Sequence, residues 1–131
     1  GNYQDFKLKT TNILQAVGMY VYENLRSNKV LINPPQGGFY LMPEFINKKY
    51  KTSSDMCVAA LKETGVALLP GSAFGFKPRK MLARLSFTDF NGSNFLNNVT
   101  STKNISIAKV EKYAPNVVAG VKTLSKWAQK L

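Results

Sequence analysis

The sequence predicts an α+β fold, in which helices pack against a small antiparallel or mixed sheet, with a long helix at the N-terminus and another at the C-terminus. Apolar residues recur at helical spacing near both ends of the 131-residue chain. Between these ends they form short runs typical of strands, separated by the proline and glycine that interrupt regular structure. Because 44% of the residues are hydrophobic, the chain can bury a core, and we expect a single domain over residues 1–131.

The first third of the chain is predicted to contain a long helix and an antiparallel hairpin. Residues 5–26 form the helix, because six apolar side chains fall near one face: Phe6, Ile13, Leu14, Val17, Val21 and Leu25. Residues 29–32 form a short strand. The segment 33–37 contains two prolines and a glycine, which favour a turn into a return strand at residues 38–42.

The middle of the chain is predicted to contain a second helix and a third strand. Ser53 or Ser54 caps the helix, Asp55 lies favourably in its first turn, and Gly65 ends it. One face of this helix consists of Cys57, Ala60, Leu61 and Thr64. Residues 66–69 form the third strand, and the small residues that follow it at 71–76 allow an unusual backbone path.

The fourth strand, at residues 81–87, is an apolar run interrupted by one charged residue, Arg84. Side chains alternate between the faces of a strand, which separates Leu82, Arg84 and Ser86 from Ala83, Leu85 and Phe87. A short helix at 93–99 and a surface loop at 100–105 follow. The last helix spans 115–131, with Pro115 in its first turn and an apolar face made of Val117, Val121, Leu124, Ala128 and Leu131.

The composition excludes several classes of function. The chain has no histidine and a single cysteine, Cys57, so it has neither a Ser-His or Cys-His catalytic pair nor a disulfide framework, and we expect no metal site. No apolar run approaches the roughly 20 residues of a membrane span, and the N-terminal residues do not resemble a signal peptide. We therefore expect a cytoplasmic protein with no membrane partner.

The net charge of +11 leaves an alternative open, a stand-alone basic module that binds nucleic acid. Most lysines are scattered along the chain, and the dense stretches are residues 48–51 and 77–80. No helix-turn-helix, zinc-finger or aromatic RNA-binding signature accompanies them, so we do not favour nucleic acid as the partner. A missing part of the protein could also balance this charge.

Arg84 has two interpretations that the residues alone do not separate. It could be a structural arginine at the edge of the sheet or paired with a carboxylate such as Asp89. It could also be held rigidly to bind a substrate carboxylate, because the planar guanidinium offers two parallel donors.

Three ordered motifs resemble class I and II aminotransferases, of the aspartate aminotransferase superfamily. Residues 35–41, PQGGFYL, resemble the "P-x-G-G-F-Y/F" strand of that family. Residues 65–75, GVALLPGSAFG, are similar to its "G-V-x-V-x-P-G-S-x-F-G" segment, and residues 82–87, LARLSF, to its "x-x-R-L-S-F" strand. With the flanking helices the resemblance covers nearly the whole chain, and residues 93–110 fit it least.

The resemblance implies that the chain is the C-terminal small domain of such an enzyme. Arg84 would then bind the α-carboxylate of the amino-acid substrate, while Gly38 and Phe39 lie on the strand that approaches the substrate. The segment 71–75 is expected to be structural rather than chemical. The intact protein would exchange an amino group between an amino acid and a 2-oxo acid, as a homodimer that uses pyridoxal phosphate.

The sequence lacks the parts that such an enzyme needs to hold its cofactor. The family's cofactor-binding lysine lies in an "S-x-x-K-x-x-x-x-x-G-x-R" context, and Lys126, the nearest imitation, sits in a helix without that glycine and arginine. We therefore expect no catalytic or cofactor-binding residue in this chain, no activity when it is isolated, and a large domain of the same polypeptide that supplies pyridoxal phosphate. The small domain of another fold-type I enzyme is a further alternative.

Overall fold

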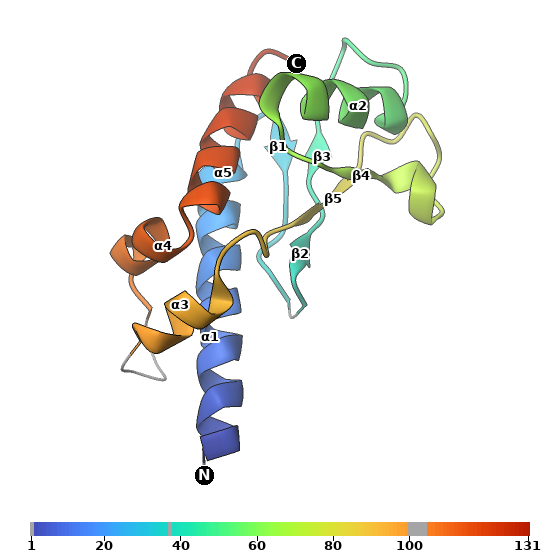
Figure 1. Ribbon diagram of the computed structural model, residues 1–131. Helices are drawn as coiled ribbons and strands as arrows, with labels where there is room; N and C mark the ends of the chain where they lie inside the picture. The colour runs from blue at the N-terminus through green and yellow to red at the C-terminus, as the bar shows by residue number, and fades with distance from the viewer. Residues whose placement is uncertain (1, 37, 100–104) are drawn as a thin grey trace.

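Helix α1, Asn2–Leu25, is the long element beside which the other elements of the fold are arranged (Figure 1). The computed structural model describes residues 2–36, 38–99 and 105–131. Helix α5, Pro115–Ala128, packs along the C-terminal half of α1, and the N-terminal turns of α1 project beyond the rest of the fold (Figure 1). Both helices were predicted, and α1 begins three residues earlier than expected.

The buried faces of these two helices agree closely with the predicted ones. Of the six apolar residues predicted for α1, Ile13, Val17, Val21 and Leu25 are buried, whereas Phe6 is 53% exposed on the projecting turns. All five residues predicted for the C-terminal face are buried, and Val118 and Trp127 join them. Pro115 occupies the first turn of α5, where its missing N–H costs no hydrogen bond.

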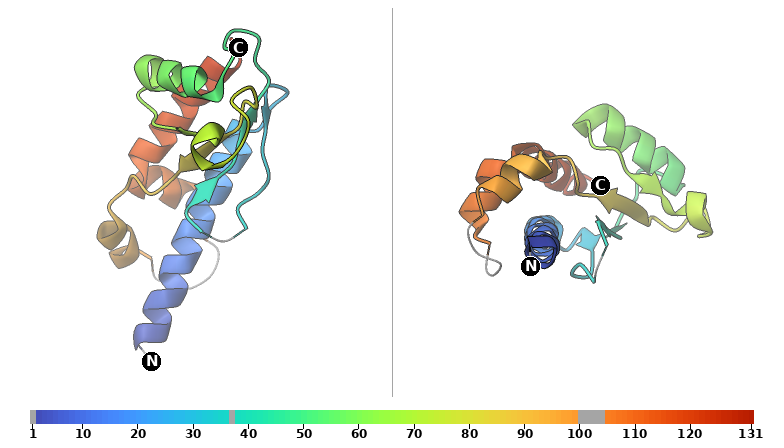
Figure 2. Two further views of the ribbon diagram at one scale, coloured as in Figure 1. Left: turned by 90° about the vertical axis from the view of Figure 1, so that its right-hand side faces the viewer. Right: turned by 60° about the horizontal axis from the view of Figure 1, so that its bottom comes forward.

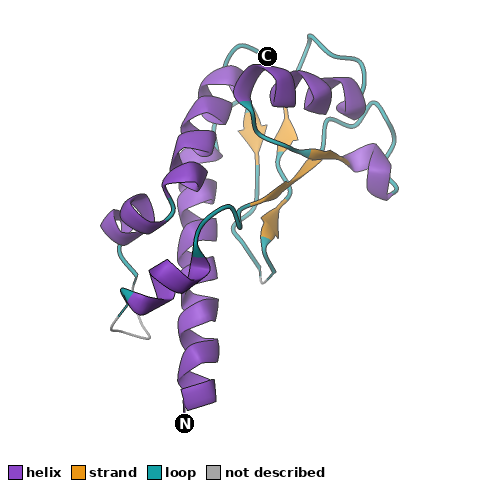
Figure 3. Cartoon of the chain, viewed as in Figure 1, coloured by secondary structure: helices purple, strands orange, loops and turns teal. Residues whose placement is uncertain are grey.

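A three-stranded antiparallel sheet has β5, Ala83–Ser86, as its central strand. Strands β2, Tyr40–Leu41, and β4, Leu69–Pro70, pair with it on either side. A second pair, β1, Val30–Leu31, and β3, Glu44–Phe45, is joined to this sheet by a bridge between Glu44 and Leu82. The strands lie to one side of α1, and α3 and α4 lie to the other (Figures 2 and 3). The predicted α+β class is therefore confirmed.

The predicted hairpin between residues 29–32 and 38–42 is wrong. Both segments contain strands, but β1 pairs with β3, and β2 pairs with β5. After Pro34 and Pro35 the chain reaches Gly38, whose φ of +85° directs β2 toward β5. The carbonyl of Pro43 then accepts a 3.0 Å hydrogen bond from the amide of Ala83, and the chain returns to β1. Turn residues indicate that a strand ends, but they do not select its partner.

The third strand is displaced from its predicted position. Residues 66–68 have no ladder partner, and β4 consists of Leu69 and Pro70. Pro70 was expected to end the strand, but it lies on the outer strand of the sheet, where a missing N–H is tolerated. The following residues, Gly71–Phe74, form one turn of 3₁₀-helix, η1, where we had expected a loop.

Helix α2, Ser53–Thr64, is capped by Thr52 rather than by Ser53 or Ser54. The Thr52 hydroxyl accepts a 3.1 Å hydrogen bond from the amide of Asp55, while Ser53 is fully buried and its amide donates to the carbonyl of Pro78. Gly65 ends the helix with a φ of +77°, as predicted. The buried face of α2 also differs from the predicted one, because Met56 is buried and Leu61 is 52% exposed.

The segment between the sheet and α5 contains one predicted and one unpredicted helix. The predicted helix at 93–99 is α3, Gly92–Asn97, and Phe95 buries its side chain between Phe90 and Tyr113. Helix α4, Ile107–Tyr113, was not predicted, because Val110 is its single buried residue and gives no periodic signal. Most of the surface loop predicted at 100–105 lies outside the described residues. No described helix is both long and apolar enough to cross a membrane.

Gly18 allows α1 to approach the sheet closely. A Cβ atom at this position would lie 2.9 Å from the ring of Phe87 and 3.1 Å from Pro35. Phe87 follows β5 and is almost completely buried, so its ring has little room to move. The missing side chain at Gly18 therefore sets the distance between α1 and the end of the central strand.

We expect Gly18→Ala to lower the free energy of unfolding, although alanine is the better helix former. Overpacking typically costs about 1–3 kcal/mol, which exceeds the roughly 1 kcal/mol gained in helix propensity. Gly120→Ala in α5 is the matched control, because its Cβ would meet only Val66, at an ordinary 3.5 Å. That change should raise the free energy of unfolding by about 0.5–1 kcal/mol. Urea denaturation measures both, and equal stabilisation would contradict the close approach at Gly18.

Candidate functional site

Arg84 lies on the central strand of the sheet, on the face opposite the core. In β5 the side chains alternate strictly, with Ala83 and Leu85 buried and Arg84 and Ser86 exposed. The neighbouring strands place Leu69 opposite Arg84, and Tyr40 opposite Ser86, on the same face. This face of the sheet therefore presents one cation among largely apolar neighbours.

Both structural interpretations of Arg84 disagree with this position. β5 is flanked by β2 and β4, so Arg84 is not at the edge of the sheet. In the described part of the chain the ion pairs are Arg26 with Glu23 and Lys80 with Glu44, and neither involves Arg84 or Asp89. Only one face of the strand is buried, and Arg84 lies on the other. The Arg84 guanidinium is exposed and has no carboxylate partner among the described residues.

Two aromatic rings lie against the Arg84 guanidinium. Its central carbon, Cζ, is 5.5 Å from the ring centroid of Tyr40 and 5.8 Å from that of Phe74. Tyr40 is on β2 and Phe74 is in η1, so the rings come from opposite sides of the central strand. Such cation–π contacts are favourable, and no side-chain hydrogen bond among the described residues uses the N–H donors of Arg84.

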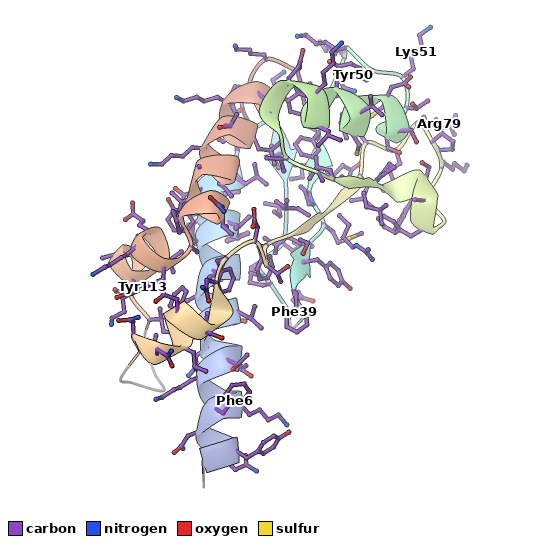
Figure 4. The ribbon with its side chains drawn as sticks, viewed as in Figure 1. Phe6, Phe39, Tyr50, Lys51, Arg79 and Tyr113 are labelled. Atoms are coloured by element: carbon purple, nitrogen blue, oxygen red, sulfur yellow. The ribbon has the colours of Figure 1, made fainter. Side chains whose placement is uncertain are left out.

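Gly38 and Phe39 stand immediately before β2, at the end of the sheet. Gly38 adopts a φ of +85°, a conformation that favours glycine, so its visible contribution is to the backbone path. Phe39 is 54% exposed and its ring lies at the tip of this segment (Figure 4). Its carbonyl accepts a 3.2 Å hydrogen bond from the amide of Phe87. Gly37 lies outside the described residues.

Tyr40 and Phe74 are neighbours of Arg84 that the sequence did not reveal. We had assigned the segment 71–75 a structural role, and the turn η1 fulfils it: the amide of Gly71 donates a 2.7 Å hydrogen bond to the carbonyl of Leu82. The same turn also carries the Phe74 ring to the guanidinium. Phe74 and Arg84 belong to different elements, and no pattern of spacing in the sequence could have paired them.

A groove of about 600 Å³ opens on the other side of β5, where residues 65–67 separate from residues 86–89 and α5 closes one wall. Its polar lining includes Thr64, Asp89 and Asn116. Arg84 does not line it, and it brings no cation close to a carboxylate. The groove therefore offers space without an arrangement for acid–base chemistry.

Two groups outside the Arg84 face have shifted pKa values. Burial raises the pKa of the Cys57 thiol to about 11, so at neutral pH it is a protonated thiol rather than a nucleophilic thiolate. Burial raises the pKa of Tyr20, and the nearby negative charge of Glu111 raises it by a smaller amount. Among the described residues there is no group of three metal-ligating acidic, cysteine or histidine side chains.

The residues around Arg84 do not fit a cofactor such as pyridoxal phosphate. Such a cofactor needs a lysine, a phosphate site and a partner for its ring nitrogen. The groups brought to the guanidinium are two aromatic rings, and the carboxylate on strand β3, Glu44, is paired with Lys80. We therefore assign no step to a cofactor held by this chain, and the expectation that it holds none stays a prediction.

The two lysine-rich stretches lie side by side in the fold. The amide of Ser53, just after residues 48–51, donates a 2.7 Å hydrogen bond to the carbonyl of Pro78, within residues 77–80. Lys51 and Arg79 extend from this end of the molecule, near the start of α2 (Figure 4). The structure thus brings the two sequence clusters together into one basic surface.

The fold of this chain is shared with proteins of known structure. The chain is similar to a structure of alanine aminotransferase from Pyrococcus furiosus, with a TM-score of 0.63 and 18% identity over 90% of this chain. It is equally similar, with a TM-score of 0.63, to an aspartate aminotransferase from Rhodobacter sphaeroides. At this identity the likeness shows the fold, and the chain covers 24% of each of these two structures.

Two curated relatives are also named as aminotransferases. The chain is 35% identical over 71 residues to an aspartate aminotransferase of Sulfolobus acidocaldarius, a match to 51% of this chain and 18% of the relative. It is 44% identical over 55 residues to a probable N-acetyl-LL-diaminopimelate aminotransferase of Bacillus subtilis, a match to 42% of this chain and 14% of the relative. No family model matches the chain.

The curated and structural neighbours of the chain are thus aminotransferases, consistent with a domain of a fold-type I pyridoxal-phosphate aminotransferase. The resemblance to aminotransferases that the three motifs indicated is confirmed, and the nucleic-acid alternative is not favoured. The role of the chain as the small domain and the roles of Arg84, Gly38 and Phe39 stay predictions.

We expect Cys57 to resist alkylation in the folded protein. An ordinary cysteine has a pKa of about 8.5, so with a pKa of about 11 the thiolate fraction at pH 8 is roughly two hundredfold smaller. Iodoacetamide labelling at pH 8, followed by mass spectrometry with and without urea, measures the difference. Because the raised pKa favours the protonated form in the folded state, stability should also fall as the pH rises from about 8.5 to about 11. Equal labelling rates with and without urea would contradict the burial of Cys57.

Proposed function

We propose that this chain is the small domain of a pyridoxal-phosphate aminotransferase and that Arg84 binds the α-carboxylate of its substrate. The intact enzyme would transfer an amino group between an amino acid and a 2-oxo acid. One observation carries the proposal: Arg84 stands exposed on a central strand, between two rings, with no carboxylate partner among the described residues. The similarity to aminotransferases supports the same assignment.

The chemistry of a carboxylate explains why this position needs arginine. A carboxylate has two oxygens in one plane, and a guanidinium can donate two parallel N–H bonds in that plane. A lysine ammonium provides the same charge but only as a point. A guanidinium fixed on the middle strand of a sheet can therefore fix both the position and the orientation of the carboxylate. That orientation determines where the amino group of the substrate points.

The remaining parts of the enzyme belong, in this proposal, to another part of the polypeptide. A large domain would hold pyridoxal phosphate and the lysine that binds it, and Arg84 would face that domain. Phe39, exposed at the end of the sheet, would help to close the site, and Gly38 would set the backbone path into its strand. We also propose that the intact protein is a homodimer. The substrate side chain would be read mainly by the other domain or the partner subunit.

We expect Arg84→Lys in the intact protein to lower kcat/KM for an amino acid by about two orders of magnitude. Lysine keeps the charge but lacks the second parallel donor and the reach of arginine, and altering one side of a desolvated, hydrogen-bonded charge pair typically costs about 2–5 kcal/mol. For amines that lack a carboxylate, the same change should lower kcat/KM much less. Half-reaction rates measured with both substrate types test this, with Arg79→Lys, a change of an exposed loop arginine, as the control. Equal losses for the two substrate types, or none for the amino acid, would contradict the assignment.

We also expect residues 1–131 alone to show no transaminase turnover when pyridoxal phosphate, an amino acid and a 2-oxo acid are supplied. The reason is that the cofactor site and its lysine are assigned to another part of the protein. Product formation and borohydride trapping followed by mass spectrometry measure this. A stoichiometric trapped adduct at one lysine, accompanied by turnover, would show that the chain is a complete enzyme.

A further inference from the structure

The Arg84 guanidinium is contacted by two aromatic rings that come from separate elements. The Tyr40 centroid is 5.5 Å and the Phe74 centroid is 5.8 Å from Arg84 Cζ. Tyr40 reaches it from β2 and Phe74 from η1, which precede β5 by about forty and ten positions in the chain. An exposed arginine side chain normally samples many rotamers, and two rings restrict it to few.

Each ring is itself fixed to the central strand. Tyr40 pairs with Ser86 in the β2–β5 ladder, which determines its face and its distance from Arg84. Phe74 lies in a turn that the amide of Gly71 attaches to the carbonyl of Leu82, at 2.7 Å. A Cβ at Gly71 would lie 3.0 Å from that carbonyl oxygen, so only glycine permits this approach without a shift.

The Phe74 ring also contacts a second aromatic ring. Phe76 meets it edge to face, with centroids 5.5 Å apart and an interplanar angle of 82°. This geometry is favourable for aromatic pairs. The ring of Phe74 is therefore braced before any ligand is bound, and the arginine between the two rings is preorganised.

The rings hold the guanidinium without neutralising it. A carboxylate in their place would fix the arginine and also consume the N–H donors that a ligand needs. The rings instead contact the cation without a carboxylate, and none of the side-chain hydrogen bonds among the described residues is donated by Arg84. Tyr40 is 47% exposed, so the pair still opens to the surface on which a ligand would arrive.

We propose that Tyr40 and Phe74 are positioning residues that hold Arg84 in the orientation that receives a substrate carboxylate. This inference rests on the proposed role of Arg84. Neither ring needs to contact the reacting atoms. Their contribution is to reduce the freedom that the arginine would lose on binding, so their removal should weaken binding of carboxylate substrates and leave the chemistry unchanged.

The test uses Tyr40→Leu and Phe74→Leu in the intact enzyme. We expect each to raise KM for the amino acid by about three- to thirtyfold, with kcat nearly unchanged, since one cation–π contact is lost. An amine without a carboxylate should be unaffected. Tyr40→Phe retains the ring, so its KM for the amino acid should stay close to that of the unmodified enzyme. Tyr22→Leu is the matched control, because the Tyr22 ring makes the same kind of contact with a different cation. Its centroid lies 5.2 Å from Cζ of Arg26.

A double-mutant cycle separates this inference from the proposed function. If Arg84→Lys lowers kcat/KM for the amino acid, the Tyr40→Leu effect should largely disappear in the Arg84→Ala background, because no cation then remains beside the ring. Equal effects on the two substrate types, or an undiminished Tyr40→Leu effect in that background, would overturn the positioning role while the role of Arg84 stands. If Arg84→Lys leaves kcat/KM for the amino acid unchanged, that result overturns the proposed function itself. Tyr40→Leu decides the question alone if Phe74→Leu does not fold.

Discussion

Strand β5 has one register in which its apolar residues are buried and its arginine is exposed. Ala83, Leu85 and Phe87 contribute to the core, while Arg84 and Ser86 point to the opposite face. A slip of one residue would exchange these sets and bury an unpaired guanidinium, which is among the most unfavourable groups to bury. The antiparallel pairings of Tyr40 with Ser86 and of Leu69 with Arg84 fix this register from both sides.

The helices connect that register to the rest of the fold. Phe87, at the end of β5, packs against α1 at Gly18, where no side chain separates the two elements. Helix α5 packs along α1, and its Trp127 contacts the rings of Phe45 and Tyr50 and donates a hydrogen bond to the carboxylate of Glu63. Contacts between helices and sheet therefore support one face of the sheet, so the other face remains open.

An exposed cation on a rigid strand suits a domain that supplies one recognition group to a larger site. The face that carries Arg84 combines a cation with aromatic surface, and in the function we propose this face would bind a carboxylate. The lysine-rich residues 48–51 and 77–80 form a second basic surface, and no cation–π contact or ion pair of the described residues joins one of their cations to the two rings beside Arg84.

The sequence by itself determined the helices that bury a full apolar face and the face of β5 on which Arg84 lies. Periodicity sufficed for α1 and α5, because each position in such a helix has a defined direction relative to the core. Periodicity did not give the partner of β1, the position of β4, the Thr52 cap or helix α4, since these depend on contacts between distant segments. The tertiary structure alone decided that Tyr40 and Phe74 meet Arg84, because a ring and a guanidinium from separate elements become neighbours only when strand register and the Gly71 turn bring them together.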